Sequence, residues 1–301
     1  LHYPLRRQRQ MCIRDRFNRR NIFFIFFILL SFGVNSSEIS KTIYASWDKP
    51  DVELLYKLPK KINKDTKVLF IIHGASRDVN RYIESWIDSA KNKNVILIAP
   101  FFSEESFPFF STLELATSSG KMLKNSNKTL TNSISSFYTF FKSKYNLSSD
   151  TYLIYGFSGG SQFVHRYMMF GEDMRIEKAA IGSAGWYTFL NDEPFPFGTK
   201  NMELNNSRKE WFLSREVLFI LGKNDDDPNH SSLNSNKEAK KQGMHRYQRG
   251  QNYFNNLINY SDNLQLPFRW RYKSVEGLDH NVEGMTDAAI PFLLSDLDYK
   301  D

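Results

Sequence analysis

Apolar residues in this chain recur in two patterns that alternate along residues 37–301. Short continuous apolar runs are typical of strands buried on both faces of a sheet, and longer runs with apolar residues at helical spacing are typical of amphipathic helices. The predicted buried strands cover residues 68–72, 95–99, 151–155, 178–183, 216–221 and 268–275. The predicted helices cover residues 79–90, 130–145, 162–170, 243–259 and 285–294. This alternation predicts an α/β fold with a mostly parallel central sheet and helices on both faces.

Two further features complete the pattern. Early runs at Thr42–Trp47 and Val52–Leu58 predict a hairpin at one edge of the sheet. The segments Phe101–Asn127 and Gly185–Arg215 are rich in Phe, Pro, Ser and Asn and have no clear period. Loops of that length in a compact domain are typically binding or lid elements, or else disordered.

The net charge of the chain is positive, but the excess of basic residues lies in its first 36 residues. The whole chain carries a net charge of +7, which favours an anionic partner such as nucleic acid. Residues 1–36, however, hold seven arginines and a single acid, which leaves 33 basic and 32 acidic residues in 37–301. The body is therefore nearly neutral, and this excludes an extended electrostatic surface for nucleic acid.

The N-terminal residues divide into two parts. LRRQRQMCIRDR, residues 5–16, resembles a translated sequencing adapter, so residues 1–16 are predicted to be non-biological. Residues 17–36 have a basic start, an apolar stretch from Ile22 to Leu30 and a small-residue cleavage site, which together predict a signal peptide. The apolar stretch is shorter than the roughly 20 residues of a membrane span. We therefore expect export to the periplasm or the medium, no stable membrane insertion after cleavage, and a single domain over residues 37–301.

The candidate nucleophile is Ser158, in YLIYGFSGGSQF (residues 152–163). Gly156-Phe157-Ser158-Gly159-Gly160 fits the G-x-S-x-G pattern between an apolar strand and a helical run, which is the context of a nucleophile elbow. A side chain at Gly156 or Gly160 is expected to collide with the neighbouring strand or helix. The alternative is a purely structural turn.

A serine hydroxyl needs a base to remove its proton. His280, in SVEGLDHN after the last predicted strand, lies in a loop that can return the imidazole to the top of the sheet. His165 is interpreted as a helix-surface or packing residue, and His230 and His245 as members of a solvated loop or helix end. His280 is therefore the predicted base.

An acid must fix the tautomer of that imidazole. The strand at 216–221 is followed by three adjacent aspartates, Asp225, Asp226 and Asp227. Asp225 is favoured because it stands close to the strand end, and Asp227 is the main alternative. The order Ser158, Asp225, His280 matches the Ser…Asp/Glu…His order of one hydrolase superfamily.

Acyl transfer also needs backbone N–H groups where negative charge develops on the carbonyl oxygen. Gly159, directly after the nucleophile, is one expected donor. Ala75, in the loop His73-Gly74-Ala75-Ser76-Arg77 after the 68–72 strand, is the other. The alternative for this loop is an ordinary turn between a strand and a helix.

Residues 66–297 resemble the α/β-hydrolase superfamily. Within it, HGASRDVNRY, GFSGG, LGKNDDD and EGLDHNVEGM look most like exported bacterial esterases of the polyhydroxybutyrate-depolymerase and feruloyl-esterase type. The resemblance implies an α/β-hydrolase fold and a serine hydrolase that acts on a small-molecule or polymeric ester.

Several alternatives remain open at this point. The same machinery can cleave peptide bonds, and a non-catalytic ligand-binding protein can keep the fold. The aromatic side chains of the two long segments either line an acyl pocket or anchor the loops to the core. The only cysteine is Cys12, and the histidines lack H-x-x-x-H spacing, so no metal site and no cofactor are predicted. The oligomeric state is left open.

Overall fold

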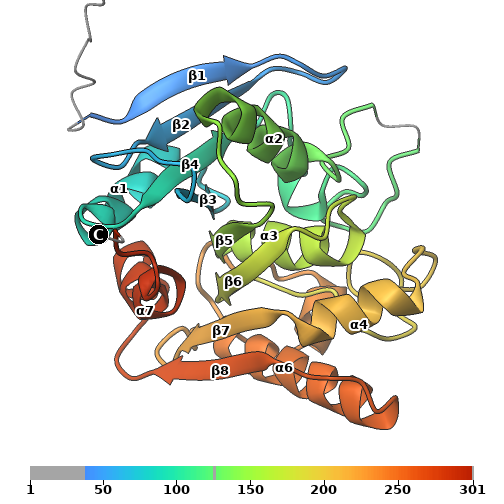
Figure 1. Cartoon of the computed structure of the whole chain (residues 1–301). Helices are drawn as coiled ribbons and strands as arrows, with labels where there is room; N and C mark the ends of the chain where they lie inside the picture. Colours follow the sequence, from blue (N-terminus) through green and yellow to red (C-terminus); the bar gives the residue numbers. More distant parts are fainter. Residues whose placement is uncertain (1–37, 125–126, 300–301) are drawn as a thin grey trace, which may run out of the picture. The chain divides into compact units, whose positions relative to one another are not determined.

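The computed structural model describes residues 38–124 and 127–299. Its eight strands form one sheet in the order β1-β2-β4-β3-β5-β6-β7-β8, drawn in Figure 1. The strands are β1 Ser40–Tyr44, β2 Val52–Lys57, β3 Lys67–Ile72, β4 Val95–Phe101, β5 Tyr152–Phe157, β6 Ile176–Gly182, β7 Glu216–Gly222 and β8 Trp270–Val275. The α-helices are α1 Val79–Ala90, α2 Ser133–Tyr145, α3 Gly159–Phe170, α4 Asn206–Ser214, α5 Lys237–Lys241, α6 Arg246–Asn263 and α7 Val282–Leu294.

The predicted sheet, mostly parallel with a hairpin at one edge, is confirmed. β1 pairs antiparallel with β2 as the edge hairpin, and β2 pairs antiparallel with β4. From β4 through β8 all pairs are parallel. The carboxyl ends of β3, β5, β6, β7 and β8 therefore meet at one edge of the sheet, which is where a ligand site is expected in an open α/β sheet.

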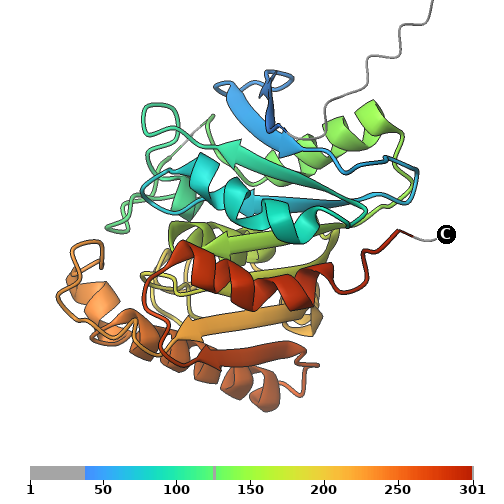
Figure 2. The same ribbon diagram turned by 90° about the vertical axis from the view of Figure 1, so that its left-hand side faces the viewer.

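Apolar side chains bury both faces of the sheet. Along β3, Phe70 and Ile72 join one apolar cluster while Leu69 and Ile71 join another, as the period of two along a strand requires. Helices α1 and α7 supply the second cluster, and Figure 2 shows them in front of the strands. Helices α2, α3, α4 and α6 cover the opposite face.

Two differences between the predicted and the observed elements have a clear physical reason. β4 does not end before Pro100 but runs to Phe101, opposite β2. β3 pairs with β4 only as far as Ile98, so the missing amide hydrogen of Pro100 removes no bond to β3. The segment 185–215, predicted to lack regular structure, contains α4; its buried residues Trp211, Phe212 and Leu213 are consecutive and give no helical period.

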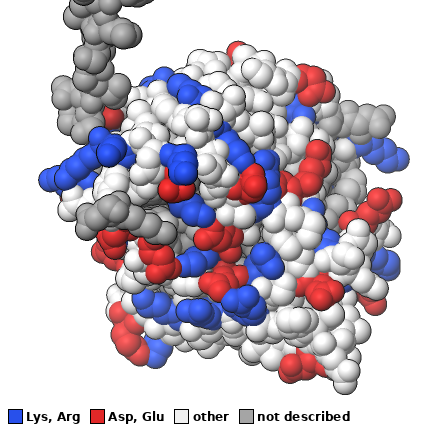
Figure 3. Space-filling view, in the orientation of Figure 1, with Lys and Arg blue, Asp and Glu red and all other residues white. Residues whose placement is uncertain are grey.

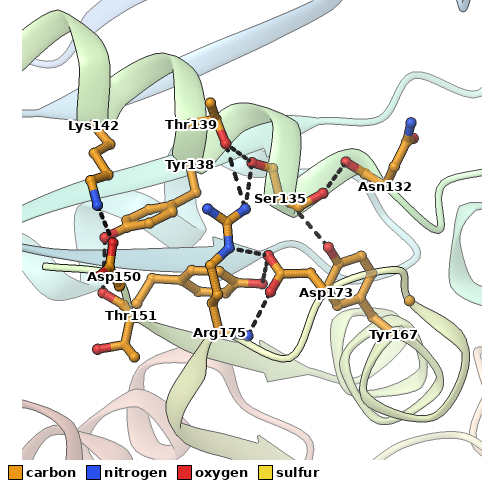
Figure 4. Close-up of polar contacts among 12 residues, drawn as sticks. Asn132, Ser135, Tyr138, Thr139, Lys142, Asp150, Thr151, Tyr167, Asp173 and Arg175 are labelled. Atoms are coloured by element: carbon orange, nitrogen blue, oxygen red, sulfur yellow. Dashed lines mark hydrogen bonds and ion pairs between the residues drawn. The ribbon is translucent and has the colours of Figure 1, made fainter.

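The amino ends of the strands are held by a separate polar network, shown in Figure 4. Arg175 Nε donates to Asp173 Oδ2 at 3.0 Å, and its Nη2 donates to the Ser135 carbonyl oxygen at 3.1 Å. The Tyr138 hydroxyl donates to the Thr151 carbonyl oxygen at 3.1 Å. These contacts fasten α2 to the edge of the sheet opposite the one that carries Ser158.

Surface charge follows the near-neutral composition of the body. On the face drawn in Figure 3, basic and acidic side chains are interspersed. Among the described residues, oppositely charged side chains form ion pairs, such as Lys178 with Asp296 at 2.8 Å and Lys93 with Asp298 at 2.7 Å. The predicted leader, residues 1–36, lies outside the described residues. None of the described helices combines the length and the apolar character needed to cross a membrane.

Candidate active site

Ser158 sits on a sharp turn between β5 and α3. Its backbone has φ 57° and ψ −118°, a strained conformation for a residue with a side chain. The turn is tight because two glycines allow it. A Cβ on Gly156 would lie 2.3 Å from the Gly160 carbonyl oxygen, and a Cβ on Gly160 would lie 2.0 Å from the Ile72 carbonyl oxygen. The predicted collisions at both glycines are therefore confirmed.

The structure brings Ser158 and His280 together across 122 residues of sequence. His280 Nε2 lies 3.0 Å from Ser158 Oγ. The imidazole packs on Phe157, with 4.6 Å between ring centroids, and Asn281 caps the start of α7 directly after it. His280 is thus placed by β8 and α7 on one side and by the elbow on the other.

The other ring nitrogen of His280 meets Asp225, as the sequence predicted for the favoured aspartate. His280 Nδ1 lies 2.8 Å from Asp225 Oδ2. The Asp225 side chain is 3% exposed, whereas Asp226 and Asp227 are exposed. The loops that carry the acid and the imidazole are themselves joined, because the Asn224 amide donates to the Leu278 carbonyl oxygen at 2.9 Å.

The electrostatics suit a neutral imidazole beside an ionised carboxylate. Burial opposes the charge on Asp225, but the hydrogen bond from His280 and the positive charge of Arg246 outweigh it and lower the pKa of Asp225. Burial is the main cause that lowers the pKa of His280 below 6.5; the Asp225 carboxylate opposes this shift and Arg246 adds to it. At neutral pH, His280 can therefore accept a proton at Nε2.

The two predicted backbone donors lie side by side. A Cβ on Gly159 would be 2.8 Å from the Ala75 amide nitrogen. Within the described ranges, neither amide donates a hydrogen bond to another segment of the chain. Both N–H groups therefore lie close together next to Ser158 without a hydrogen-bond partner in another described segment.

His73 and Arg77 hold the loop that carries Ala75. His73 Nδ1 donates to the Gly74 carbonyl oxygen at 2.9 Å and its Nε2 accepts from the Phe102 amide at 3.1 Å. Burial lowers the pKa of His73 to about 4, so the ring is neutral, as these two roles require. Arg77 Nη2 donates to the Phe107 carbonyl oxygen at 3.1 Å. The Ala75 loop is thus fixed to the segment after β4.

Comparison with solved structures shows which known proteins have a similar architecture. The chain resembles the poly(aspartic acid) hydrolase-1 of Sphingomonas sp. KT-1, with a TM-score of 0.78 and 28% identity over 85% of this chain and 98% of that one. It also resembles the poly(3-hydroxybutyrate) depolymerase LpqC of Bordetella parapertussis, with a TM-score of 0.77 and 22% identity over 87% and 92% of the two chains. The chain has the α/β-hydrolase fold.

A more distant likeness within this fold is the S-formylglutathione hydrolase of Agrobacterium tumefaciens. Its TM-score is 0.56 at 10% identity, over 86% of this chain and 94% of that one. No family model matches the chain, and no curated protein matches it in sequence. The three structures named here are of proteins described as a hydrolase or a depolymerase, so the comparisons support an enzyme that catalyses hydrolysis.

Most of the aromatic side chains in the two long segments anchor this α/β-hydrolase fold. Residues 101–110 and 186–197 hold ten aromatic side chains, and seven of them are buried: Phe102, Phe107, Phe110, Trp186, Tyr187, Phe195 and Phe197. Phe102 stacks on Phe163 of α3 at 5.3 Å between centroids. Core anchoring is therefore the main role of these residues. Phe101, Phe109 and Phe189 are partly exposed.

Three other histidines, His165, His230 and His245, lie where the sequence predicted. His165 is fully buried, with Nδ1 2.7 Å from the Ser161 carbonyl oxygen, and His245 caps the start of α6. His230 lies in a loop, as predicted, and its partly exposed ring stands beside the ring of His280, at 5.7 Å between centroids.

Arg246 is the residue at this site that sequence reasoning missed. Its guanidinium Nη1 lies 3.3 Å from Asp225 Oδ1, and both side chains are almost completely buried. The sequence signal was an arginine at the start of a helix, RYQRGQNYF, which is ordinarily a solvent-exposed position. Arg246 therefore joins the carboxylate from the side opposite His280.

Proposed function

We propose that this chain is a serine hydrolase that cleaves a carboxylic ester through an acyl-enzyme. The observation that carries the proposal is the continuous chain of contacts from Ser158 Oγ to His280 Nε2 at 3.0 Å and from His280 Nδ1 to Asp225 Oδ2 at 2.8 Å. A nucleophile, a base and an orienting acid in this relation are the arrangement that activates a serine hydroxyl.

Each residue has a defined role in the proposed reaction. Ser158 Oγ attacks the ester carbonyl carbon while His280 Nε2 takes the hydroxyl proton. The amides of Ala75 and Gly159 donate to the carbonyl oxygen as it becomes negative. His280 then gives the proton to the leaving alcohol. A water molecule, deprotonated by His280, attacks the acyl-enzyme, and His280 returns this proton to Ser158 Oγ as the acid is released.

Hydrolysis of an amide bond in a polymer of amino acids is the second candidate. It is favoured by the resemblance to a poly(aspartic acid) hydrolase at 28% identity, since the same site geometry serves both bonds.

Export is a separate proposal that depends on residues 17–36. It is tested by N-terminal sequencing of the protein recovered from the periplasm and the medium.

The test of the proposed function is covalent labelling with a fluorophosphonate, followed by mapping of the labelled peptide. Label should appear on Ser158 and be absent in Ser158→Ala, which should also lose hydrolysis of p-nitrophenyl butyrate by several orders of magnitude. Ser161→Ala is the matched control. Ser161 lies one turn further along α3, and its hydroxyl makes no hydrogen bond among the described residues. Labelling of Ser158→Ala at the wild-type rate would refute the assignment.

A substrate panel then separates the two candidate bonds. Matched p-nitrophenyl esters, p-nitroanilides and short aspartate oligomers should be compared by kcat/KM. Preference for the oligomers over all esters would favour the amide hydrolase. Absence of labelling and of all turnover in a folded protein would favour a non-catalytic ligand-binding protein.

A further inference from the structure

The proposed acid has a second partner that the catalytic steps above do not use. Asp225 presents Oδ2 to His280 and Oδ1 to Arg246 Nη1 at 3.3 Å. The side chains of Arg246 and Asp225 are 1% and 3% exposed. A buried ion pair is weak evidence for stability, because desolvation of both charges opposes their attraction. The buried Arg246–Asp225 pair is therefore better explained by a role in the candidate active site than by a contribution to stability.

Arg246 is held in place by more than its carboxylate. It is the first residue of α6, and the amide of the next residue, Tyr247, donates to the Asp225 carbonyl oxygen at 3.0 Å. Arg246 Nη2 donates to Ser232 Oγ at 2.8 Å. Ser232 Oγ lies 3.1 Å from His230 Nδ1, and the His230 ring stands beside the ring of His280. A continuous set of contacts thus runs from the carboxylate around to the other side of the imidazole.

We propose that Arg246 is a positioning residue for the hydrolysis: it fixes Asp225 in the orientation that meets His280, and its positive charge opposes protonation of the His280 ring. This inference rests on the proposed serine hydrolase. Arg246 acts through Asp225 and does not touch the reacting atoms.

Orientation follows from hydrogen-bond chemistry. An ionised carboxylate accepts at both oxygens, and both neighbours here are donors, His280 Nδ1–H and Arg246 Nη1–H. With both oxygens engaged, rotation of the carboxylate breaks two charge-assisted hydrogen bonds instead of one. Without Arg246, Oδ1 would be buried and poorly satisfied, and the carboxylate would be free to turn away from His280.

The electrostatic consequence has a definite sign. Among the described residues, the charged or titratable groups that act on His280 are Asp225, Arg246 and His230, and Tyr187 also faces Asp225. Asp225 favours the protonated ring, whereas Arg246 disfavours it. Removal of Arg246 leaves the attraction of Asp225 unopposed from that side. His280 then holds its proton to higher pH, and less of the enzyme has a free base in weakly acidic solution.

The experiment measures the pH profile of kcat/KM for p-nitrophenyl butyrate and of the fluorophosphonate labelling rate, between pH 5 and 9. The variants are Arg246→Met, which removes the charge at similar volume, Arg246→Lys, which keeps the charge, and Arg249→Met as control. Arg249 is a fully buried guanidinium one turn further along α6, where it donates to the Gly243 and Gly185 carbonyl oxygens. It makes no contact with Asp225 within the described residues.

In Arg246→Met the acidic limb of both profiles should move to higher pH by about half a unit to one unit, and the alkaline plateau of kcat should fall about tenfold with little change in KM. Arg246→Lys should restore the acidic limb but not the full plateau, because an ammonium group lacks the planar donor geometry. Arg249→Met should keep the wild-type limb.

Several outcomes would overturn this inference. A wild-type limb in Arg246→Met, or an equal shift in Arg249→Met, would show that Arg246 has only a structural role. A wild-type plateau in Arg246→Lys would remove the positioning part of the proposal, and this comparison stands even if Arg246→Met does not fold. An unlabelled, inactive wild-type enzyme would instead overturn the proposed function, so the two failures are distinguishable.

Discussion

Replacement of Asp225 by asparagine should nearly abolish activity, for a reason that depends on both of its partners. Each Asp225 oxygen faces a donor: Oδ1 faces Arg246 and Oδ2 faces His280. Asparagine has one oxygen and one NH2 group, so it can satisfy only one of the two donors. Arg246 cannot give up its proton, and its charge should therefore attract the amide oxygen.

The NH2 group of asparagine then faces His280 Nδ1 and forces that nitrogen to act as an acceptor. The ring proton moves to Nε2, which points at Ser158 Oγ and can no longer accept the serine proton. Loss of the correct tautomer in a Ser-His-Asp site lowers kcat by about 10⁴-fold, which corresponds to about 5.4 kcal/mol in the activation free energy. The amide is close in shape to the carboxylate, so the fold should be retained.

The assay is kcat/KM for p-nitrophenyl butyrate at pH 8, with thermal unfolding to verify the fold. Asp227→Asn is the control, because Asp227 is exposed and its Oδ1 accepts only from the nearby Asn229 amide at 2.8 Å within the described residues. Its activity should stay within about twofold of wild type, as for surface changes generally. A loss below tenfold in Asp225→Asn, or a larger loss in Asp227→Asn, would refute the reasoning.

The double variant isolates the role of Arg246 in this effect. In an Arg246→Met background the guanidinium no longer attracts the amide oxygen on the far side, so asparagine can turn its oxygen toward His280 and restore the productive tautomer. Asp225→Asn should therefore cost at least tenfold less activity in that background than in the wild type. Equal losses in both backgrounds would show that the tautomer is not controlled through Arg246.

Two further predictions concern the Ala75 loop. A Cβ at Gly74 would lie 2.4 Å from the Tyr82 hydroxyl oxygen, so Gly74→Ala should lower kcat and the melting temperature. Adding Tyr82→Phe removes this hydroxyl and should recover both quantities in the double variant. If they do not recover, the loss has another cause. Burial lowers the pKa of His73 from 6.5 to about 4, so between these values the unfolded chain binds a proton that the folded chain does not. As the pH is lowered below about 6.5, the free energy of unfolding should therefore decrease, by about 1.4 kcal/mol per pH unit from this group. Chemical denaturation at pH 7 and pH 5 should show a smaller decrease in His73→Asn than in the wild type.

Local patterns in the sequence predict the elements of this fold well. β3, α1 and β7 were found within a residue of their observed bounds, because their apolar runs are either continuous or strictly periodic. α4 was missed because the packing of its apolar residues is decided by neighbours distant in sequence. Tertiary contact, not local pattern, made that segment helical.

The candidate site divides in the same way. Ser158 and His280 could be predicted because each stands at a strand end in a recognisable local context. Asp225 could only be favoured over Asp227, since no local signal tells which of three adjacent aspartates is buried. Arg246 and His230 reach the site because the 223–245 segment folds over the edge of the sheet. No local sequence pattern in that segment predicts the position that it takes.

The backbone of Ser158 bears on how such a chain can change over generations. A glycine would adopt φ 57° with less strain than any residue with a side chain, so most of the conformational cost at this position is incurred to present one hydroxyl. A chain of this fold that made no use of the hydroxyl would become more stable by replacing this serine with glycine. Selection for stability alone would therefore favour glycine at position 158.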